Sequence, residues 1–489
     1  CIDPEFVDIL YFLILMVANM LNSLIALASM NLVFQRHCCP RRQRPEYRPE
    51  SYPAVSVVVA CYLPNEEAII ESTIEHIMQQ LEWEGPLTLW VVYNTPKPMA
   101  FEQVLLGMDG REYGHNRRLR VVAATTSTSK AHNLNLVLDM LTDEYVALYD
   151  ADHHPAADSL TLLMRYLQSG WGTSGWETSE GRYVAMQGST FIRNRQGSLI
   201  ARAVDAEFFV THFVYFPAME LLGGTGYFGG SNALWRTAVL RDYKFDHAML
   251  TEDVDLSARA LLAGDRIGFC PRARSGELAP SGWKALVSQR LRWFMGWEQV
   301  THKYYWHVFR TKSLSARRVL GFLYLFHVRW PLLLAAVLAA VINPVVTSPF
   351  IYPLFTWSLP IVICVLAAVY LYIFVSMLGI HSAYTHEQGR RVVAAISVAI
   401  FFVFGWVYVV THFTLQSIAF VKVFIFKEYK WEVTARLLQV DGDGDGDGSS
   451  CIAFFDLLMT AGTEPSSCDV AFTIGGAGDN ALVSFEAPP

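Results

Sequence analysis

The sequence is poor in charged residues. Only 17% of its 489 residues are charged, whereas soluble globular proteins carry about 25%. Hydrophobic residues make up 53% of the chain, and this balance indicates segments that lie in a lipid bilayer. The formal net charge of −7 gives no support for nucleic-acid binding, which needs an excess of basic residues. We therefore expect a membrane protein that does not bind nucleic acid.

Paired cysteine motifs are also missing. The eight cysteines are scattered and include no C-x-x-C pair, so the sequence predicts neither a zinc ribbon nor a disulfide framework. Cys38 and Cys39 follow the first apolar segment within a basic stretch. Palmitoylation of these two residues and a pair of unmodified cytosolic thiols are the two alternatives.

Four apolar segments indicate membrane crossings, each of which takes roughly 20 apolar residues. The first is followed by five arginines between Arg36 and Arg48, and because positive loops stay in the cytoplasm, the residues after 35 should be cytosolic. Three further crossings would place Lys427, Lys430 and Arg436 outside, against the same rule, so their number stays open. We expect a multi-pass protein of the plasma or inner membrane, with apolar segments at 7–34, 317–345, 351–378 and 393–425.

Residues 51–310 alternate between strand-like and helix-like patterns. Short runs rich in β-branched residues are bounded by polar turns, as in buried strands, and helical patterns such as 66–81 lie between them. This alternation predicts an α/β domain with a mostly parallel sheet, in which ligands gather at the carboxyl ends of the strands. The predicted strands are VSVVVACYL (55–63), LTLWVVY (87–93), RLRVVAA (118–124) and VALYD (146–150).

Two carboxylates follow the last of these strands. Asp150 and Asp152, in DADHHP, stand at i and i+2 across an expected turn. Their oxygens could hold Mg²⁺ or Mn²⁺, hard ions that accept carboxylate and phosphate oxygens together. Aspartate is also common in turns, so a purely local role is the alternative.

Two other segments place charged residues at expected helix starts. Lys130, in STSKAHNLN (127–135), could meet a phosphate near a helix N-terminus, or it is an ordinary exposed lysine. TEDVDLSARALLAG (251–264) predicts a helix that Thr251 caps and Gly264 ends. A functional interpretation of the same segment makes Asp253 a general base.

The segment QRLRW (289–293) holds two arginines and a tryptophan. Arg290 and Arg292 point to different sides whether the segment is a strand or a helix, so one guanidinium can face a diphosphate while the other has a different partner. Trp293 offers a flat apolar face for a sugar ring. The alternative is an interfacial membrane helix with Arg and Trp anchors.

Four motifs follow one another in the α/β domain between the apolar segments, in the order K-A-x-N-L-N, D-A-D-H-x-P, T-E-D and Q-R-x-R-W. This arrangement resembles the processive membrane-embedded enzymes of glycosyltransferase family 2. This group includes cellulose, curdlan, chitin and hyaluronan synthases. DADH and FGGSNALWR (228–236) are more similar to the cellulose and β-glucan branch. The resemblance implies a membrane segment (1–35), a basic linker (36–50), a cytosolic GT-A domain with an interfacial helix (51–310), a C-terminal membrane region (311–436) and a flexible tail (437–489).

The resemblance also implies a role for each matched residue. Asp150 and Asp152 match ligands of the metal and of the UDP diphosphate, and Asp253 matches the general base. Lys130 matches a donor-binding lysine, although His132 stands where the family usually has Gly. The other implied donor contacts are Glu66, Asn94, Gln289 and Arg292, and the implied acceptor contacts are Gly230, Ser231, Glu252 and Trp293.

The implied reaction is processive, inverting transfer of a sugar from a UDP-sugar to the non-reducing end of a growing β-linked polysaccharide, coupled to export. DADH favours glucose. KWEVTAR (430–436) resembles the gating loop of cellulose synthases, although it follows the last apolar segment. The alternatives are transfer to a lipid carrier, a chitin, hyaluronan or mannan synthase, a hydrolase, and a transporter or inactive scaffold. A homo-oligomer and accessory subunits stay open as partners.

Overall fold

A computed structural model of the protein describes residues 20, 24–25, 27–32, 51–114, 116–169, 183–280, 282–312, 314–327, 408, 411–412 and 414–427. The chain divides into two units, Cys1–Leu438 and Gln439–Pro489, and every described residue belongs to the first. Most of the four apolar segments, the linker 36–50, the segment KWEVTAR and the tail lie outside the described residues. Within the described part of the chain, no helix combines the length and the hydropathy that a membrane crossing requires.

The four predicted strands form one half of the sheet. Their order is β3-β2-β1-β4, and every neighbouring pair in this half is parallel. Parallel pairing brings their carboxyl ends to one edge, where Asp150 is the last residue of β4. The bounds are β1 (Val55–Tyr62), β2 (Leu87–Asn94), β3 (Arg117–Ala123) and β4 (Tyr145–Asp150).

The other half of the sheet is mixed, so the expectation of a mostly parallel sheet is confirmed only in part. β7 lies between β4 and β6 and is antiparallel to both, whereas β6 and β8 are parallel. β5 pairs antiparallel with β8. β7 has four residues and β5 has two, too few for a sequence pattern to indicate their direction. The bounds are β5 (His154–Pro155), β6 (Tyr183–Ile192), β7 (Ala233–Arg236) and β8 (Arg266–Glu277).

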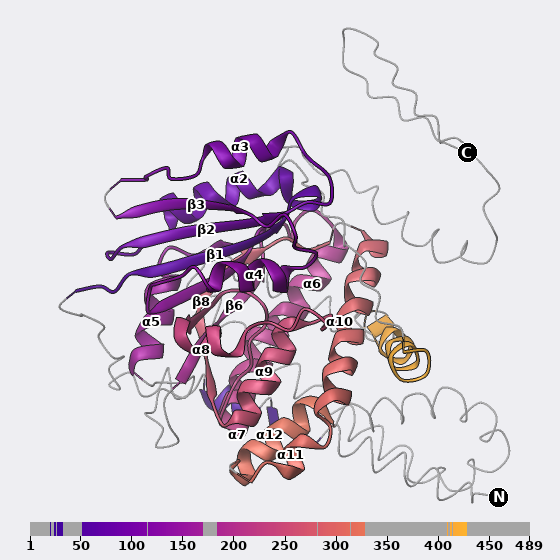
Figure 1. Ribbon diagram of the computed structural model, residues 1–489. Helices are drawn as coiled ribbons and strands as arrows, with labels where there is room; N and C mark the ends of the chain where they lie inside the picture. Colours follow the sequence, from indigo (N-terminus) through magenta and orange to yellow (C-terminus); the bar gives the residue numbers. More distant parts are fainter. Residues whose placement is uncertain are drawn as a thin grey trace, which may run out of the picture. The chain divides into compact units, whose positions relative to one another are not determined.

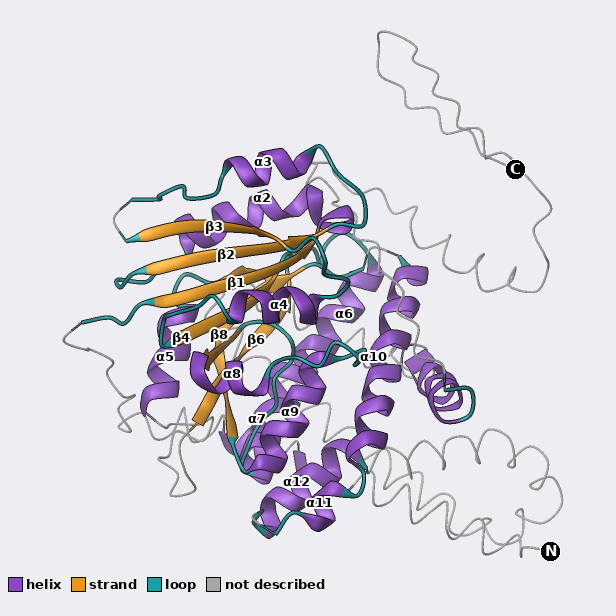
Figure 2. Ribbon diagram, viewed as in Figure 1, coloured by secondary structure: helices purple, strands orange, loops and turns teal. Residues whose placement is uncertain are grey.

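Helices cover both faces of the sheet (Figures 1 and 2). Successive residues of a strand point to opposite faces, and in β1 the side chains of Val57 and Val59 join one core while Val58 joins the other. The first core contains α2 (Leu63–Gln80), α3 (Phe101–Gly107) and α5 (Ser159–Ser169). The second contains α4 (Lys130–Leu138), α8 (Thr237–Tyr243) and α9 (Glu252–Ala263).

The helix predicted at 66–81 begins earlier, at Leu63, and places Pro64 in its first turn. Proline is tolerated there because the first amides of a helix have no partner within it. The proline that interrupts ACYLPNEE therefore starts a helix directly after β1.

Of the remaining helices, those within residues 199–223 pack against β6 and β8. α6 (Leu199–Phe209) continues through a π-helical segment, η1 (Val210–Tyr215), into α7 (Phe216–Gly223). α10 (Trp283–Tyr304) contains QRLRW, so this segment is a helix and not a strand. It is followed by α11 (His307–Arg310) and α12 (Ala316–Phe326). The helical residues among 408–427 lie beside α10 (Figure 1), where Met295 packs against Ala419 and Val423.

Candidate active site

A cavity of about 590 Å³ opens at the carboxyl ends of β1, β2 and β4. It gathers side chains from α4, α6, α9 and α10, segments that are far apart in the sequence. Every residue for which the sequence predicted a site role lines this cavity, except Asp152, which is buried. The predicted residues in its lining are Glu66, Asn94, Lys130, Asp150, Gly230, Ser231, Glu252, Asp253, Gln289, Arg292 and Trp293.

Lys130 places a positive charge among the carboxylates of the cavity. It begins α4, which Ser129 caps by accepting a hydrogen bond from the amide of His132 at 3.2 Å. Its Nζ forms an ion pair with Asp150 and lies 3.8 Å from Oε1 of Glu252. Burial opposes the charge of Lys130, but these carboxylates outweigh burial and raise its pKa. Lys130 is therefore a fixed ammonium group and not an ordinary exposed lysine.

Asp150, Asp152 and His153 form a cluster that could hold a metal ion. One potential ligand atom from each lies within 4.8 Å of the others. Oδ2 of Asp152 accepts a hydrogen bond from the amide of Leu278 at 3.2 Å, which fixes one carboxylate oxygen. Two carboxylates beside an imidazole are a donor set that fits Mg²⁺ or Mn²⁺.

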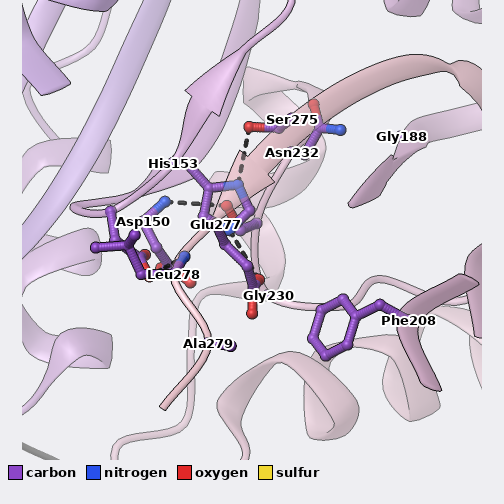
Figure 3. A network of polar contacts seen from close by, with 12 residues as sticks. Asp150, His153, Gly188, Phe208, Gly230, Asn232, Ser275, Glu277, Leu278 and Ala279 are labelled. Atoms are coloured by element: carbon purple, nitrogen blue, oxygen red, sulfur yellow. Dashed lines mark hydrogen bonds and ion pairs between the residues drawn. The ribbon is translucent and has the colours of Figure 1, made fainter. Parts of the chain in front are cut away.

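His153 was not among the predicted site residues, although its place directly after Asp152 could have indicated it. Dashed lines in Figure 3 join its ring to Ser275 and Glu277 of β8, with the Nδ1–Oγ distance 2.9 Å and the Nε2–Oε2 distance 3.2 Å. Burial opposes its charge, but Glu277 outweighs burial and raises the pKa of His153. To ligate a metal, the ring would have to release one of these two contacts, so the aspartates are the primary ligand candidates.

Asp253 stands in the first turn of α9 and lines the cavity. Burial and the neighbouring charge of Glu252 raise its pKa to about 7, while Lys130 acts in the opposite direction. A carboxylate whose pKa lies near neutral pH is suited to accept a proton in the reaction.

Thr251 occupies the N-cap position of α9, as predicted, but only its backbone takes part in the cap. Thr251 has φ −127° and ψ 84°, and its side chain makes no capping hydrogen bond. It packs instead against Gly296 of α10, where an added Cβ would lie 2.3 Å from Cγ2 of Thr251. This contact between two helices overrides the local capping preference. Gly264 ends α9 in the left-handed conformation, as predicted.

The two arginines of QRLRW have separate surroundings. Arg290 is buried and donates hydrogen bonds to Glu207 of α6 at 2.7 Å and to Oε1 of Gln289 at 2.8 Å. Arg292 and Trp293 are half-buried in the cavity lining. The helical spacing thus directs one guanidinium to α6 and the other to the cavity.

Two implied donor contacts already have partners within the protein. Oδ1 of Asn94 accepts a hydrogen bond from Nδ2 of Asn133 at 2.7 Å. Oε2 of Glu66 accepts one from the amide of Tyr62 at 2.8 Å, which satisfies an amide at the start of α2. Both residues line the cavity, so their proposed ligand contacts would add to these structural ones.

Several lining residues were missed because they carry no motif. Glu207, Phe208, His212 and Phe216 come from the α6–η1–α7 helix, whose sequence resembles an ordinary apolar helix. The segment η1 is π-helical, and π-helical turns are frequently found at functional sites. Aromatic rings also line the cavity at Tyr227, Phe294 and Trp297.

Comparisons with known proteins place the domain in a family. Residues 53–296 match the model of "Glycosyltransferase like family 2". The poly-β-1,6-N-acetyl-D-glucosamine synthase of Staphylococcus epidermidis is 24% identical over 262 residues, which cover 53% of this chain and 58% of that protein. The probable glycosyltransferase YdaM of Bacillus subtilis is 22% identical over 287 residues, which cover 57% and 64%. The chain thus spans less than two thirds of the length of these relatives.

Among solved structures, a mannosyltransferase of Pyrobaculum calidifontis in complex with GDP-Man and Mn²⁺ is 19% identical, with a TM-score of 0.43, over 78% of this chain and 99% of that one. The family match covers the candidate metal cluster, the QRLRW segment and every residue of the cavity lining except Trp297 and His412. Residues 53–296 therefore form a glycosyltransferase family 2 domain of the GT-A type.

Proposed function

We propose that the protein is a membrane-bound, processive and inverting glycosyltransferase that elongates a β-linked polysaccharide from a UDP-sugar. One observation carries the proposal: a single cavity brings together Asp150, Asp253 and the Gln289–Trp293 segment. These residues supply the three functions that sugar transfer requires, namely diphosphate binding, proton removal and acceptor binding.

The donor diphosphate would bind among the basic groups and the aspartate pair. Lys130, Gln289 and Arg292 present nitrogen donors to the cavity, and Asp150 and Asp152 would hold Mg²⁺ or Mn²⁺. When bound, the cation would help neutralise the charge that develops on the UDP leaving group. Arg292 and Lys130 would stabilise the same charge from fixed positions, which is worth most in a site that excludes water.

Asp253 would act as the general base. Its carboxylate would take the proton of the acceptor hydroxyl as that oxygen attacks C1 of the donor sugar. A bond forms from the acceptor oxygen to C1, the bond from C1 to the phosphate oxygen breaks, and UDP leaves with the bonding electrons. One displacement inverts the anomeric carbon, so an α-linked donor gives a β-linked product.

The acceptor chain would stack on Trp293. The cavity holds further aromatic rings beside it, and Tyr227 and Trp297 contact each other edge to face with centroids 5.7 Å apart. Several aromatic rings in one cavity offer apolar surfaces to a chain of sugar rings that stays bound between additions, which supports polymer synthesis over transfer of one sugar to a lipid carrier.

The donor sugar is proposed to be glucose or N-acetylglucosamine. DADH favours glucose, whereas the names of the Staphylococcus relatives favour N-acetylglucosamine. We further propose that the apolar segments 7–34, 317–345, 351–378 and 393–425 anchor the protein in the membrane and conduct the product outward.

Labelled donors test the proposal. Membranes that contain the full-length protein would be supplied with UDP-glucose, UDP-N-acetylglucosamine or GDP-mannose, with Mn²⁺, Mg²⁺ or a chelator, and the products sized and digested with linkage-specific hydrolases. We expect a metal-dependent polymer from one UDP-sugar and none from the Asp253→Asn variant. A single-sugar lipid product, a polymer from GDP-mannose alone, or no transfer at all would refute it.

A further inference from the structure

Glu207 connects three helices beside the cavity. It lies in α6, lines the cavity, and forms an ion pair with Arg290 of α10 at 2.7 Å. It also accepts a hydrogen bond from the hydroxyl of Tyr408, and its Oε1 lies 3.8 Å from Nε2 of His412. Burial disfavours its charge, but Arg290 and the contacts with His412 and Tyr408 lower its pKa to about 2. Glu207 is therefore a charged carboxylate with partners on both α10 and the C-terminal helical residues.

Arg290 carries this connection to the substrate-facing residues of α10. Its Nη1 donates to Oε1 of Gln289 at 2.8 Å, which leaves the amide nitrogen of Gln289 as the donor end of that side chain. Its guanidinium carbon lies 4.1 Å from the ring centroid of Trp293, within the range of a cation–π contact. The Arg290 side chain is 1% exposed although it belongs to the cavity lining, and it contacts both of these neighbours there.

The C-terminal helical residues reach the same place. Tyr408 and Trp293 belong to one apolar cluster with Phe208, and His412 contacts Phe294 edge to face at 5.5 Å. Further along α10, His302 contacts Phe424 at 5.1 Å. The C-terminal residues thus follow α10 beyond the Glu207 contact, and both Tyr408 and His412 contact the Glu207 carboxylate.

We propose that Glu207 is a positioning residue. Through Arg290 it fixes Gln289 on the donor side and Trp293 on the acceptor side, and Tyr408 transmits the position of the C-terminal helix to the Glu207–Arg290 ion pair. The inference rests on the proposed function. It assigns the first arginine of QRLRW to the alignment of donor and acceptor, because this arginine contacts Glu207, Gln289 and Trp293 at once.

The consequence is a link between two substrates and the segment 393–425, which is proposed to anchor the protein in the membrane. Donor and acceptor must lie within about 3–3.5 Å of each other to react, and a displacement of about 1 Å can cost about 100-fold in rate. One buried ion pair that orients both Gln289 and Trp293 keeps their spacing constant. A movement of Tyr408 would alter both contacts together.

Kinetics of the full-length protein in membranes test the inference. Tyr408→Phe removes only the hydroxyl that binds Glu207, and Glu207→Gln removes the charge that holds Arg290. We expect Tyr408→Phe to lower kcat/KM about tenfold, since a hydrogen bond to a charged group is lost, and Glu207→Gln to lower it about 100-fold. Both should raise the KM for the UDP-sugar and shorten the polymer, whereas a smaller folded fraction would change neither.

Asp205→Asn is the matched control. Asp205 lies on the same helix, is paired with Arg195 at 3.8 Å, and does not line the cavity. We expect this variant to keep the wild-type KM and product length.

A double-mutant cycle with Trp293→Phe adds a second criterion, because coupled residues are non-additive. Tyr408→Phe should have little further effect on product length in the Trp293→Phe background. If the wild type is active, two results would overturn the inference alone. One is a Tyr408→Phe variant that behaves like the wild type, and the other is that the effects of Tyr408→Phe and Trp293→Phe multiply independently. An inactive wild type would overturn the proposed function and the inference with it.

Discussion

Gly230 lies directly against the carboxylate of Asp253. A Cβ added to Gly230 would come within 2.8 Å of Oδ2 of Asp253, and Gly230 has φ of +91°, which disfavours any side chain. The neighbouring Gly229 has its nearest Cβ contact at 3.8 Å, with Phe216. In FGGSN, the position of the proposed base thus requires glycine at 230 but not at 229.

Gly230→Ala should therefore reduce transfer far more than Gly229→Ala. The added methyl group would strain the backbone by about 1–2 kcal/mol and displace Asp253, and we expect kcat to fall about 100-fold. Initial rates with each variant, together with thermal melting, separate the two effects. Equal rates for the two alanine variants would contradict the close approach of Gly230 to the base.

Asp253→Asn should abolish sugar transfer while UDP still binds. The amide keeps the shape of the side chain but cannot accept the proton of the acceptor hydroxyl. Calorimetry with UDP and Mn²⁺ should give an affinity within about threefold of the wild type, since the diphosphate contacts lie elsewhere in the cavity. Loss of UDP affinity with normal turnover would assign Asp253 to the donor site instead.

The rate should depend on pH through Asp253. Its pKa is raised to about 7, so below that pH the carboxyl group holds a proton and cannot act as a base, and kcat/KM, which reports the free enzyme, should fall as the pH is lowered through 7. Glu252 contributes to the raised pKa by repulsion. Glu252→Gln should therefore move the acidic limb of the kcat/KM profile to lower pH, and a shift to higher pH would contradict this electrostatic origin.

Local patterns in the sequence predicted much of the site because the fold makes them converge. The first four strands were found from their β-branched runs, and the parallel pairing of β1, β2 and β4 brings Asn94 and Asp150 to the same edge of the sheet. The helical alternative for QRLRW predicted that Arg290 and Arg292 would have different surroundings. These inferences depend only on the geometry of single elements and on the common direction of the strands.

Features that depend on contacts between distant segments were not predicted. Thr251 has the residue type of a helix cap, but its packing against Gly296 determines its conformation. Glu207 lies in an apolar helix without a motif, and only the fold reveals its ion pair with Arg290. The direction of β7 likewise depends on its two neighbours and not on its own four residues.

Gly296→Ala should destabilise the domain. The new Cβ would lie 2.3 Å from Cγ2 of Thr251, so α9 and α10 would have to separate, and overpacking of this kind costs about 1–3 kcal/mol. Thermal unfolding of the detergent-solubilised protein measures the effect. Gly282→Ala is the control, since an added Cβ there meets no described atom within 4 Å, and similar melting temperatures for the two variants would contradict the close packing.

Replacement of Asp152 should weaken the metal-dependent part of nucleotide binding. Asp152 and Asp150 present their carboxylates within one cluster, so Asp152→Asn removes a charged ligand, and loss of even an outer-shell partner costs about 10–100-fold in metal affinity. We expect the Mn²⁺ affinity, followed by electron paramagnetic resonance, and the affinity for UDP in Mn²⁺ each to fall at least about tenfold. With a chelator present, wild type and variant should bind UDP alike, because the contacts of Lys130 and Arg292 remain.

Asp158→Asn, at an exposed aspartate of the same segment, should behave as the wild type. An unchanged Mn²⁺ affinity in Asp152→Asn would show that the cation, if one binds, is held elsewhere.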